Sequence, residues 1–149
     1  MVDLLQTKIG QVLKRFSLIS STAVWFYSMD NKTQKKILDW IRNDQLQKGL
    51  NEDNEIIGLY SLWTEKINPE KVAGTPYTLE DTGEFYRSLF ITVLNDIFEI
   101  DGEGQKSPTD NLFTLLGDGI VGLNDQSKEK LRIELINRIN EYIRKKILR

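Results

Sequence analysis

The sequence predicts a small α+β domain, on three observations. Apolar residues recur at helical spacing near both ends of the chain, two short β-rich runs lie close together at residues 90–100, and a long stretch without regular periodicity precedes them. The 149 residues are a usual length for one domain, and 40% hydrophobic residues suffice for a packed core. We therefore expect a single domain over 1–149, with N-terminal helices, a long loop, a short helix, a β-hairpin and a long C-terminal helix.

Residues 1–43 are expected to be helical. Apolar side chains step by three or four positions over about residues 3–20, at Leu5, Ile9, Val12, Phe16 and Ile19. The apolar segment 22–27 continues this helix or packs against it, and Asp30-Asn31 predicts a break. A second helix is expected over about 32–46, with Ile37, Leu38, Trp40 and Ile41 on its buried side and Gly49 as its C-cap.

The segment 51–78 is predicted to be a long loop with a short extended piece at 55–61. Its periodicity is poor, and glycines and prolines interrupt it. Loops of this length in a compact domain are usually functional or disordered. The loop contains Tyr60, Trp63 and Tyr77, and aromatic side chains are common anchors of protein interfaces. These three residues are therefore candidate interface residues.

The segment Asp81-Thr82-Gly83-Glu84 is expected to start a short helix, because Asp81 or Thr82 can cap it and Glu84 stands at capping-box spacing from Asp81. Two β-rich runs, 90–94 and 97–100, flank a two-residue Asn-Asp link and predict a hairpin. We treat the four-residue segment as structural. Capping explains its carboxylates better than glycoside hydrolysis does.

The C-terminal part is predicted to contain a short helix at 110–116, a glycine-rich turn and a long helix capped by Asn124. The apolar stripe of the long helix consists of Leu131, Leu135, Ile136, Ile139, Tyr142, Ile143 and Ile147. The turn contains Gly117, Gly119 and Gly122 in the spacing of a dinucleotide fingerprint, but a helix precedes it and no second strand follows. We expect these glycines to permit positive-φ turns.

Composition excludes several kinds of chemistry. The chain has no Cys and no His, so it has no thiolate nucleophile, no Ser–His pair and no Cys- or His-ligated metal. Two acidic strings, 51–55 and 101–105, lack the glycine and glutamate of an EF-hand. We expect no enzymatic activity, cofactor or metal. The start of the chain lacks the pattern of a secretory signal, and no apolar run is long enough for a membrane span.

Charge is segregated along the chain, although the net charge is only −2. Residues 80–125 carry ten acidic and two basic side chains, whereas 126–149 carry eight basic and three acidic ones. Near its end lie Arg144, Lys145 and Lys146, further candidate interface residues that could also touch DNA non-specifically. Solvated faces explain this segregation, and so does electrostatic matching between neighbouring copies or partners.

Residues 75–91 resemble the T-L-x-D-T-G-x-F-x-x-S segment of virion-morphogenesis and tail-completion-like proteins of tailed bacteriophages. Upstream, Gln45-Leu46-Gln47-Lys48-Gly49 and Tyr60-Ser61-Leu62-Trp63-Thr64 are similar to the family's Q-L-x-x-G and Y-S-x-x-T. Downstream, residues 117–123 resemble its G-x-x-I-x-G-L turn. The resemblance spans about residues 44–149.

The resemblance implies a structural virion protein, made in the cytoplasm of a host bacterium, that forms a ring at the neck or upper tail. Its partners would be further copies of itself and the portal, adaptor or tail proteins, with no membrane involved. It implies no catalytic residues. The alternative is an intracellular binding or regulatory module without a virion role.

Overall fold

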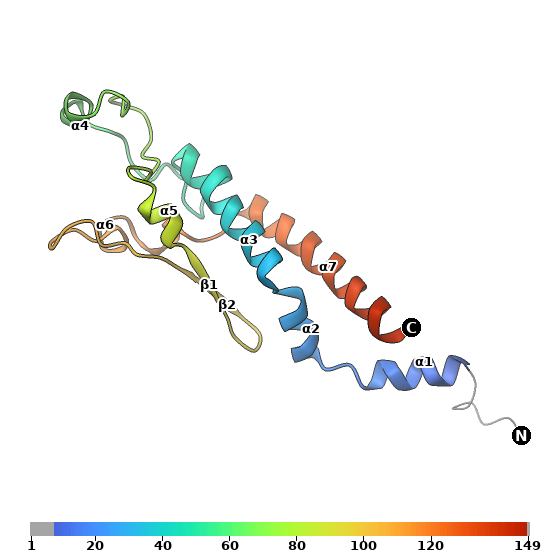
Figure 1. Cartoon of the computed structure of the whole chain (residues 1–149). Coiled ribbons are helices and arrows are strands. Elements are labelled where there is room, and N and C mark those ends of the chain that lie inside the picture. Colours follow the sequence, from blue (N-terminus) through green and yellow to red (C-terminus); the bar gives the residue numbers. More distant parts are fainter. Residues whose placement is uncertain (1–7, 149) are drawn as a thin grey trace, which may run out of the picture.

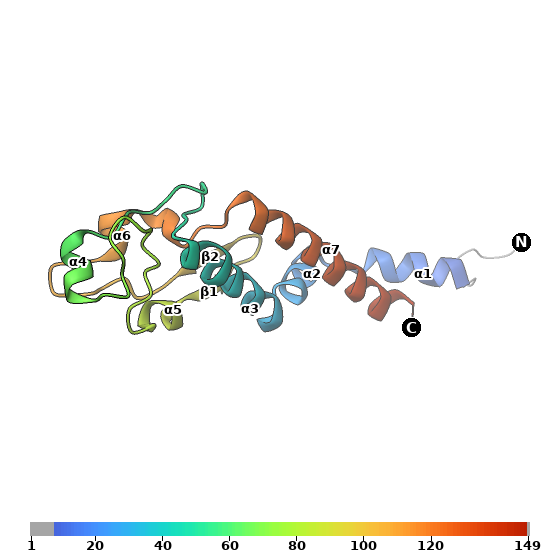
Figure 2. The same cartoon turned by 90° about the horizontal axis from the view of Figure 1, so that it is seen from above.

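The computed structural model describes residues 8–148 and confirms the predicted α+β class. The molecule is elongated (Figure 1). Helix α1 and the C-terminal end of the long helix α7 lie at one end, and the short helix α4 lies at the other, as a second view also shows (Figure 2). The β-hairpin runs along the side of the helices between these two ends.

The N-terminal part forms two short helices and one long composite helix. Helix α1 covers Lys8–Ser17, and α2 covers Ser21–Ser28 after a break at which Ser20 caps the new helix. The helix expected over about 3–20 ends at Ser17, and Leu5, the first residue of its apolar stripe, lies outside the described residues. Helix α3 (Asn31–Asp39) continues directly into a π-helical segment, η2 (Trp40–Gln45), and a 3₁₀ turn, η3 (Leu46–Lys48).

Both ends of the composite helix agree with the prediction. Asp30 accepts a hydrogen bond from the Thr33 backbone N–H at 3.0 Å and so caps the N-terminus. Gly49 ends it with a φ of +70°, the left-handed conformation that favours glycine. Ile37 and Ile41 are fully buried.

The rest of the chain alternates loops with short elements before the long final helix. The elements are α4 (Leu62–Ile67), α5 (Glu84–Ser88), β1 (Phe90–Val93), β2 (Phe98–Asp101), α6 (Leu112–Leu116), the 3₁₀ turn η4 (Asp118–Ile120) and α7 (Asp125–Ile147). Strands β1 and β2 form the predicted antiparallel hairpin, in which Val93 pairs with Phe98. Asn124 caps α7 by accepting the Ser127 backbone N–H, as expected.

Helix α7 runs antiparallel to α3 and α2, and polar contacts join them along most of its length. Lys130 pairs with Asp44, and Lys36 pairs with Glu134. Further along, Arg138 pairs with the capping carboxylate of Asp30. Its guanidinium also lies 4.8 Å from the centre of the Tyr27 ring. The contacts fix the register between the N-terminal helices and α7.

The amide of Gln45 joins the composite helix to the start of α7. Gln45 is fully buried; its Nε2 donates to the Gly122 carbonyl at 2.7 Å. Its Oε1 accepts from the Asn124 backbone N–H and from the Ser127 hydroxyl, both at 3.1 Å. Asn124 extends the network by donating to the Asn54 side chain at 2.8 Å. One buried side chain thus satisfies three polar groups at the turn before α7.

The hydrophobic core is formed by residues of η2, η3, α5, α6, η4 and the start of α7 together with Met29 and Ile37. Its central members are Met29, Ile37, Ile41, Leu46, Phe85, Leu89, Leu112, Ile120, Leu123 and Leu131. The inner face of the hairpin, which includes Ile91 and Phe98, packs against them.

Replacing Gln45 by Leu is predicted to lower the free energy of unfolding by about 2–4 kcal/mol, because three buried polar groups lose their partner. Gln47 lies on the same turn but is exposed, so Gln47→Leu is the matched control. Urea unfolding measures the free energy of unfolding of both variants. A difference below about 0.5 kcal/mol between the two variants would contradict this account of the network.

Candidate functional site

Residues 59–76 form a closed arm at the end of the molecule opposite the termini (Figure 1). Its base is held by an antiparallel bridge between Leu59 and Pro76 and by hydrogen bonds that join Tyr60 to Thr75 and Gly74, each 2.9 Å long. Helix α4 occupies its tip. The sequence predicted an irregular loop here, whereas the structure contains this short helix.

Polar contacts within the arm hold its shape. The Ser61 hydroxyl caps α4 by accepting the Thr64 backbone N–H at 3.1 Å. The Glu65 carboxylate accepts the Ala73 backbone N–H at 2.9 Å. These contacts order the arm without burying its large apolar side chains.

The apolar side chains of the arm point into solvent. Trp63 and Ile67 are each 70% exposed and Leu62 is 73% exposed. Leu59, at the base of the arm, and Val72, on its returning segment, are also exposed. The five residues Leu59, Leu62, Trp63, Ile67 and Val72 are called the arm patch below. Three large apolar side chains that are each at least 70% exposed within one six-residue helix are typical of an interaction surface.

The structure separates the three aromatic residues that the sequence predicted as interface anchors. Trp63 lies in the arm patch. Tyr60 and Tyr77 instead pack edge to face on each other at the base of the arm, with ring centres 4.9 Å apart. The Tyr77 ring also covers Gly58, where a Cβ would lie about 2.5 Å from it. Tyr60 and Tyr77 therefore support the arm, whereas Trp63 is presented by it.

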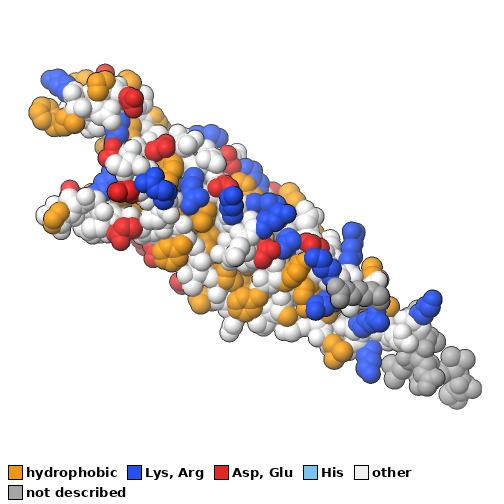
Figure 3. All heavy atoms as spheres, viewed as in Figure 1, with side chains coloured by type: hydrophobic (Ala, Val, Ile, Leu, Met, Phe, Trp, Pro, Cys, Tyr) orange, Lys and Arg blue, Asp and Glu red, His pale blue; other side chains and the backbone are white. Residues whose placement is uncertain are grey.

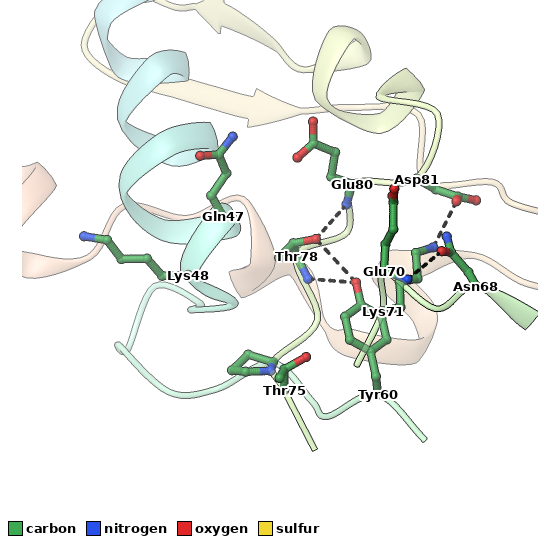
Figure 4. Close-up of a pocket in the computed structure, with 11 residues that line it drawn as sticks. Gln47, Lys48, Tyr60, Asn68, Glu70, Lys71, Thr75, Thr78, Glu80 and Asp81 are labelled. Carbon is green, nitrogen blue, oxygen red and sulfur yellow. Dashed lines mark hydrogen bonds and ion pairs between the residues drawn. The ribbon is translucent and has the colours of Figure 1, made fainter. Parts of the chain in front are cut away.

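A polar hollow of about 510 Å³ lies between the arm and the end of the composite helix (Figure 4). Lys71 and Asp81 form an ion pair of 2.9 Å at its wall. The hydrogen bond and charge of Lys71 lower the pKa of the Asp81 carboxyl. Tyr60 donates or accepts a hydrogen bond with Thr78 at 3.3 Å. Within residues 8–148, no group of acidic side chains is arranged to hold a metal ion.

The segment 81–84 begins α5 differently from the prediction. Asp81 does not cap the helix, because its carboxylate is turned toward Lys71. Gly83 occupies the N-cap position with a φ of +77°, and no side chain caps there. Thr82 accepts the Glu84 backbone N–H in a long hydrogen bond of 3.4 Å. The capping box is therefore absent.

The three glycines before α7 have two different roles. Gly117 has a φ of +84°, as expected for a positive-φ turn. Gly119 and Gly122 do not, so the prediction was wrong for them. Both lie against the Glu52 side chain, and the Glu52 backbone N–H donates to the Gly119 carbonyl at 2.9 Å. At Gly122 an added Cβ would lie only 2.7 Å from the Glu52 Cβ, so the absence of a side chain permits this close approach.

The predicted basic residues at the end of α7 are all exposed, but they differ in their contacts. Lys145 pairs with Glu141 at 2.8 Å and donates to the Tyr27 hydroxyl at 2.9 Å. Lys146 lies 5.9 Å from the Tyr142 ring centre. In the described part of the chain, the Arg144 guanidinium has no ion-pair partner. Arg144 and Lys146 are thus the more available of the three.

The acidic region 80–125 is largely unneutralised. Within the described chain, its ion pairs are those of Asp81 with Lys71 and of Asp125 with Lys128. On the face seen in Figure 3, Lys and Arg gather over α3, α7 and α1, whereas most Asp and Glu lie toward α4, α5 and α6. Together with the excess of acidic side chains in residues 80–125 and of basic ones in 126–149, this gives an acidic half and a basic half of the molecule.

Comparison of the chain with models of known protein families, with curated proteins and with solved structures finds no match. None of the described helices combines the length and apolar character that a membrane span requires.

Replacing Gly122 by Ala is predicted to lower the free energy of unfolding by about 1–2 kcal/mol, because the new Cβ overlaps the Glu52 side chain. The double variant Glu52→Ala/Gly122→Ala should recover about half of that loss, compared with Glu52→Ala alone. Thermal unfolding of the four chains gives this coupling. Gly→Ala at an unstrained site usually stabilises, so a neutral or stabilising Gly122→Ala would exclude the close approach.

Proposed function

We propose that this chain is a structural virion protein of a tailed bacteriophage, forming a ring at the neck or upper tail that joins the portal or head to the tail. It acts without enzymatic activity or a cofactor. Its partners in this role are further copies of itself and the neighbouring portal, adaptor or tail proteins. The motifs at residues 45–49, 60–64, 78–88 and 117–123 support the phage assignment by their resemblance to the family and by their order.

The observation that carries the assembly role is the arm patch. Trp63, Ile67 and Leu62 are displayed on a pre-ordered arm that stands away from the core. Burial of exposed apolar side chains stabilises a contact by about 25 cal/mol for each Å² of apolar surface removed from water. Trp residues are also frequent hot spots of protein interfaces. A subunit that inserts such an arm into a neighbour gains affinity without first ordering a loop.

Charge segregation supports a head-to-tail arrangement of copies. The unneutralised carboxylates of the acidic half and the exposed Arg144 and Lys146 near the end of α7 can face each other when one copy follows another. A heterologous contact of this kind closes into a ring when the rotation between copies fits. Exposed charges mainly fix register and encounter rate, and salt screens them over about 8–10 Å.

The alternative is an intracellular binding or regulatory module, and the arm patch also suits that role. Location distinguishes the two. A virion subunit is present at fixed stoichiometry in purified particles and appears as a ring in their reconstruction, whereas a regulatory module is found only in the infected cell.

The double variant Trp63→Ser/Ile67→Ser is predicted to abolish assembly while changing the free energy of unfolding by less than about 0.5 kcal/mol, because both side chains are exposed. Lys66 lies between them on α4 and is also exposed, so Lys66→Ser is the matched control. Native mass spectrometry, with and without the portal and tail neighbours, reads the assembly state. Normal ring formation by the double variant, or absence of the chain from virions, would contradict the proposed function.

A further inference from the structure

Positive charge is concentrated at the end of the molecule where α1 and the end of α7 lie (Figure 3). Residues 8–38 and 134–148 form α1, α2, most of α3 and the second half of α7. Together these two segments carry ten basic and only three acidic side chains. The whole chain nevertheless has a net charge of −2, so this excess is local.

The acidic side chains of these segments are already neutralised. Asp30, Glu134 and Glu141 each pair with a Lys or Arg. Six exposed cations, in contrast, form no ion pair within the described residues. They are called the basic strip below and are Lys8 and Lys14 of α1, Lys32 and Lys35 of α3, and Arg144 and Lys146 of α7.

Contacts with α7 hold the three parts of the basic strip together. Lys36 of α3 pairs with Glu134, and Arg15 of α1 donates to the Ile147 carbonyl at 3.0 Å. The two contacts lie thirteen residues apart on α7, which corresponds to about 20 Å. On the face seen in Figure 3, Lys and Arg side chains follow α3, α7 and α1 over this length. About six base pairs of a DNA duplex have the same length.

The exposed apolar side chains of α1 point away from its two lysines. Leu13 is 54% and Phe16 49% exposed. At about 100° per residue these two share one side of the helix, whereas Lys8 and Lys14 lie toward the opposite side. A membrane surface would have to contact the apolar side, and both lysines would then face away from it. A hydrophilic polyanion needs only the cations, so the arrangement favours a polyanion.

The aromatic rings beside the end of α7 are already engaged with protein groups. Tyr27 and Tyr142 pack edge to face with ring centres 5.1 Å apart, and the Arg138 guanidinium lies 4.8 Å from the Tyr27 ring centre. Proteins that bind single strands offer free aromatic rings on which bases stack. A row of unpaired cations instead matches the regular phosphates of a duplex.

We propose that the basic strip binds the phosphate backbone of double-stranded DNA without reading its sequence. The cations of α1, α3 and α7 neutralise phosphates and release the counterions condensed on them, which supplies the affinity. The sequence suggested DNA contact only for residues 144–146, and the structure adds the lysines of α1 and α3. This inference goes beyond the proposed function and does not depend on it.

Fluorescence anisotropy of a labelled duplex tests the basic strip. At about 50 mM salt the full chain should bind with micromolar affinity, and the slope of log K against log salt should be about −4 to −5, as about five phosphate contacts give. The variant Lys8→Gln/Lys14→Gln/Lys32→Gln/Lys35→Gln should bind at least about tenfold more weakly, with a slope shallower by about 2 or more. Circular dichroism shows that each variant folds.

The matched control neutralises four exposed lysines outside the basic strip and has the same net charge as the variant. It is Lys48→Gln/Lys66→Gln/Lys106→Gln/Lys128→Gln. The control should bind the duplex to within about threefold of the original chain and keep its salt slope. Equal weakening of the control and the variant would show that only net charge matters, and would overturn the strip.

Two further probes distinguish the class of partner. At equal concentration of phosphate groups, the chain should bind the duplex more tightly than a single strand of the same length or vesicles of anionic lipid. Preference for the single strand or for the vesicles, or no binding to the duplex at about 50 mM salt, would overturn the proposal. Assembly is measured separately with the Trp63→Ser/Ile67→Ser variant, so this failure would be distinct from that of the proposed function.

Discussion

The buried amide of Gln45 determines how the helical part of the molecule meets the part that carries the hairpin, α6 and the arm. Gln45 ends the π-helical segment, and its three hydrogen bonds all go to the turn and first residues of α7. A buried amide with unmatched groups is costly, so few other positions of α7 are compatible with this network. Once the start of α7 is fixed, the residues of α7 that pair with Asp44, Lys36 and Asp30 are fixed as well.

The same constraint places the surfaces that we propose for assembly. Because α7 begins beside Gln45 and runs antiparallel to α3, its basic C-terminal end and α1 lie far from the arm. The acidic half with the exposed apolar side chains of the arm therefore lies at one end of the elongated subunit, and the basic half lies at the other. In the proposed ring, head-to-tail repetition would bring the complementary ends of successive copies together.

Strong local signals made the hairpin and α7 predictable from sequence. The Asn95-Asp96 link between two β-rich runs located the turn, and Asn124 with the following apolar stripe located the helix. Helix α4 was missed because it is only six residues long and its apolar residues face outward, although Ser61 offered a capping signal. Local sequence does not reveal a π-helical segment whose last side chain bonds to residues about 80 positions away.

The candidate site was predictable only in part for the same reason. Aromatic content pointed to the loop, but which aromatic side chain is displayed depends on the Tyr60–Tyr77 pair and on Gly58 beneath it. Asp81 had good capping chemistry, yet Lys71 lies at 2.9 Å and binds its carboxylate instead. Gly119 and Gly122 match a turn pattern, and their actual constraint is Glu52, which is distant in sequence.

We propose that a neighbouring subunit covers the exposed apolar side chains of the arm, and amide hydrogen exchange tests this most directly. The amides of α4 in the isolated monomer should exchange faster than those at the centre of α7, because exposed polar contacts hold the shape of the arm and no residue of α4 is buried. On assembly, with portal and tail neighbours included, exchange in Leu62–Ile67 should slow by about tenfold or more, while the centre of α7 should change little. Equal protection of α4 in monomer and assembly would contradict the account.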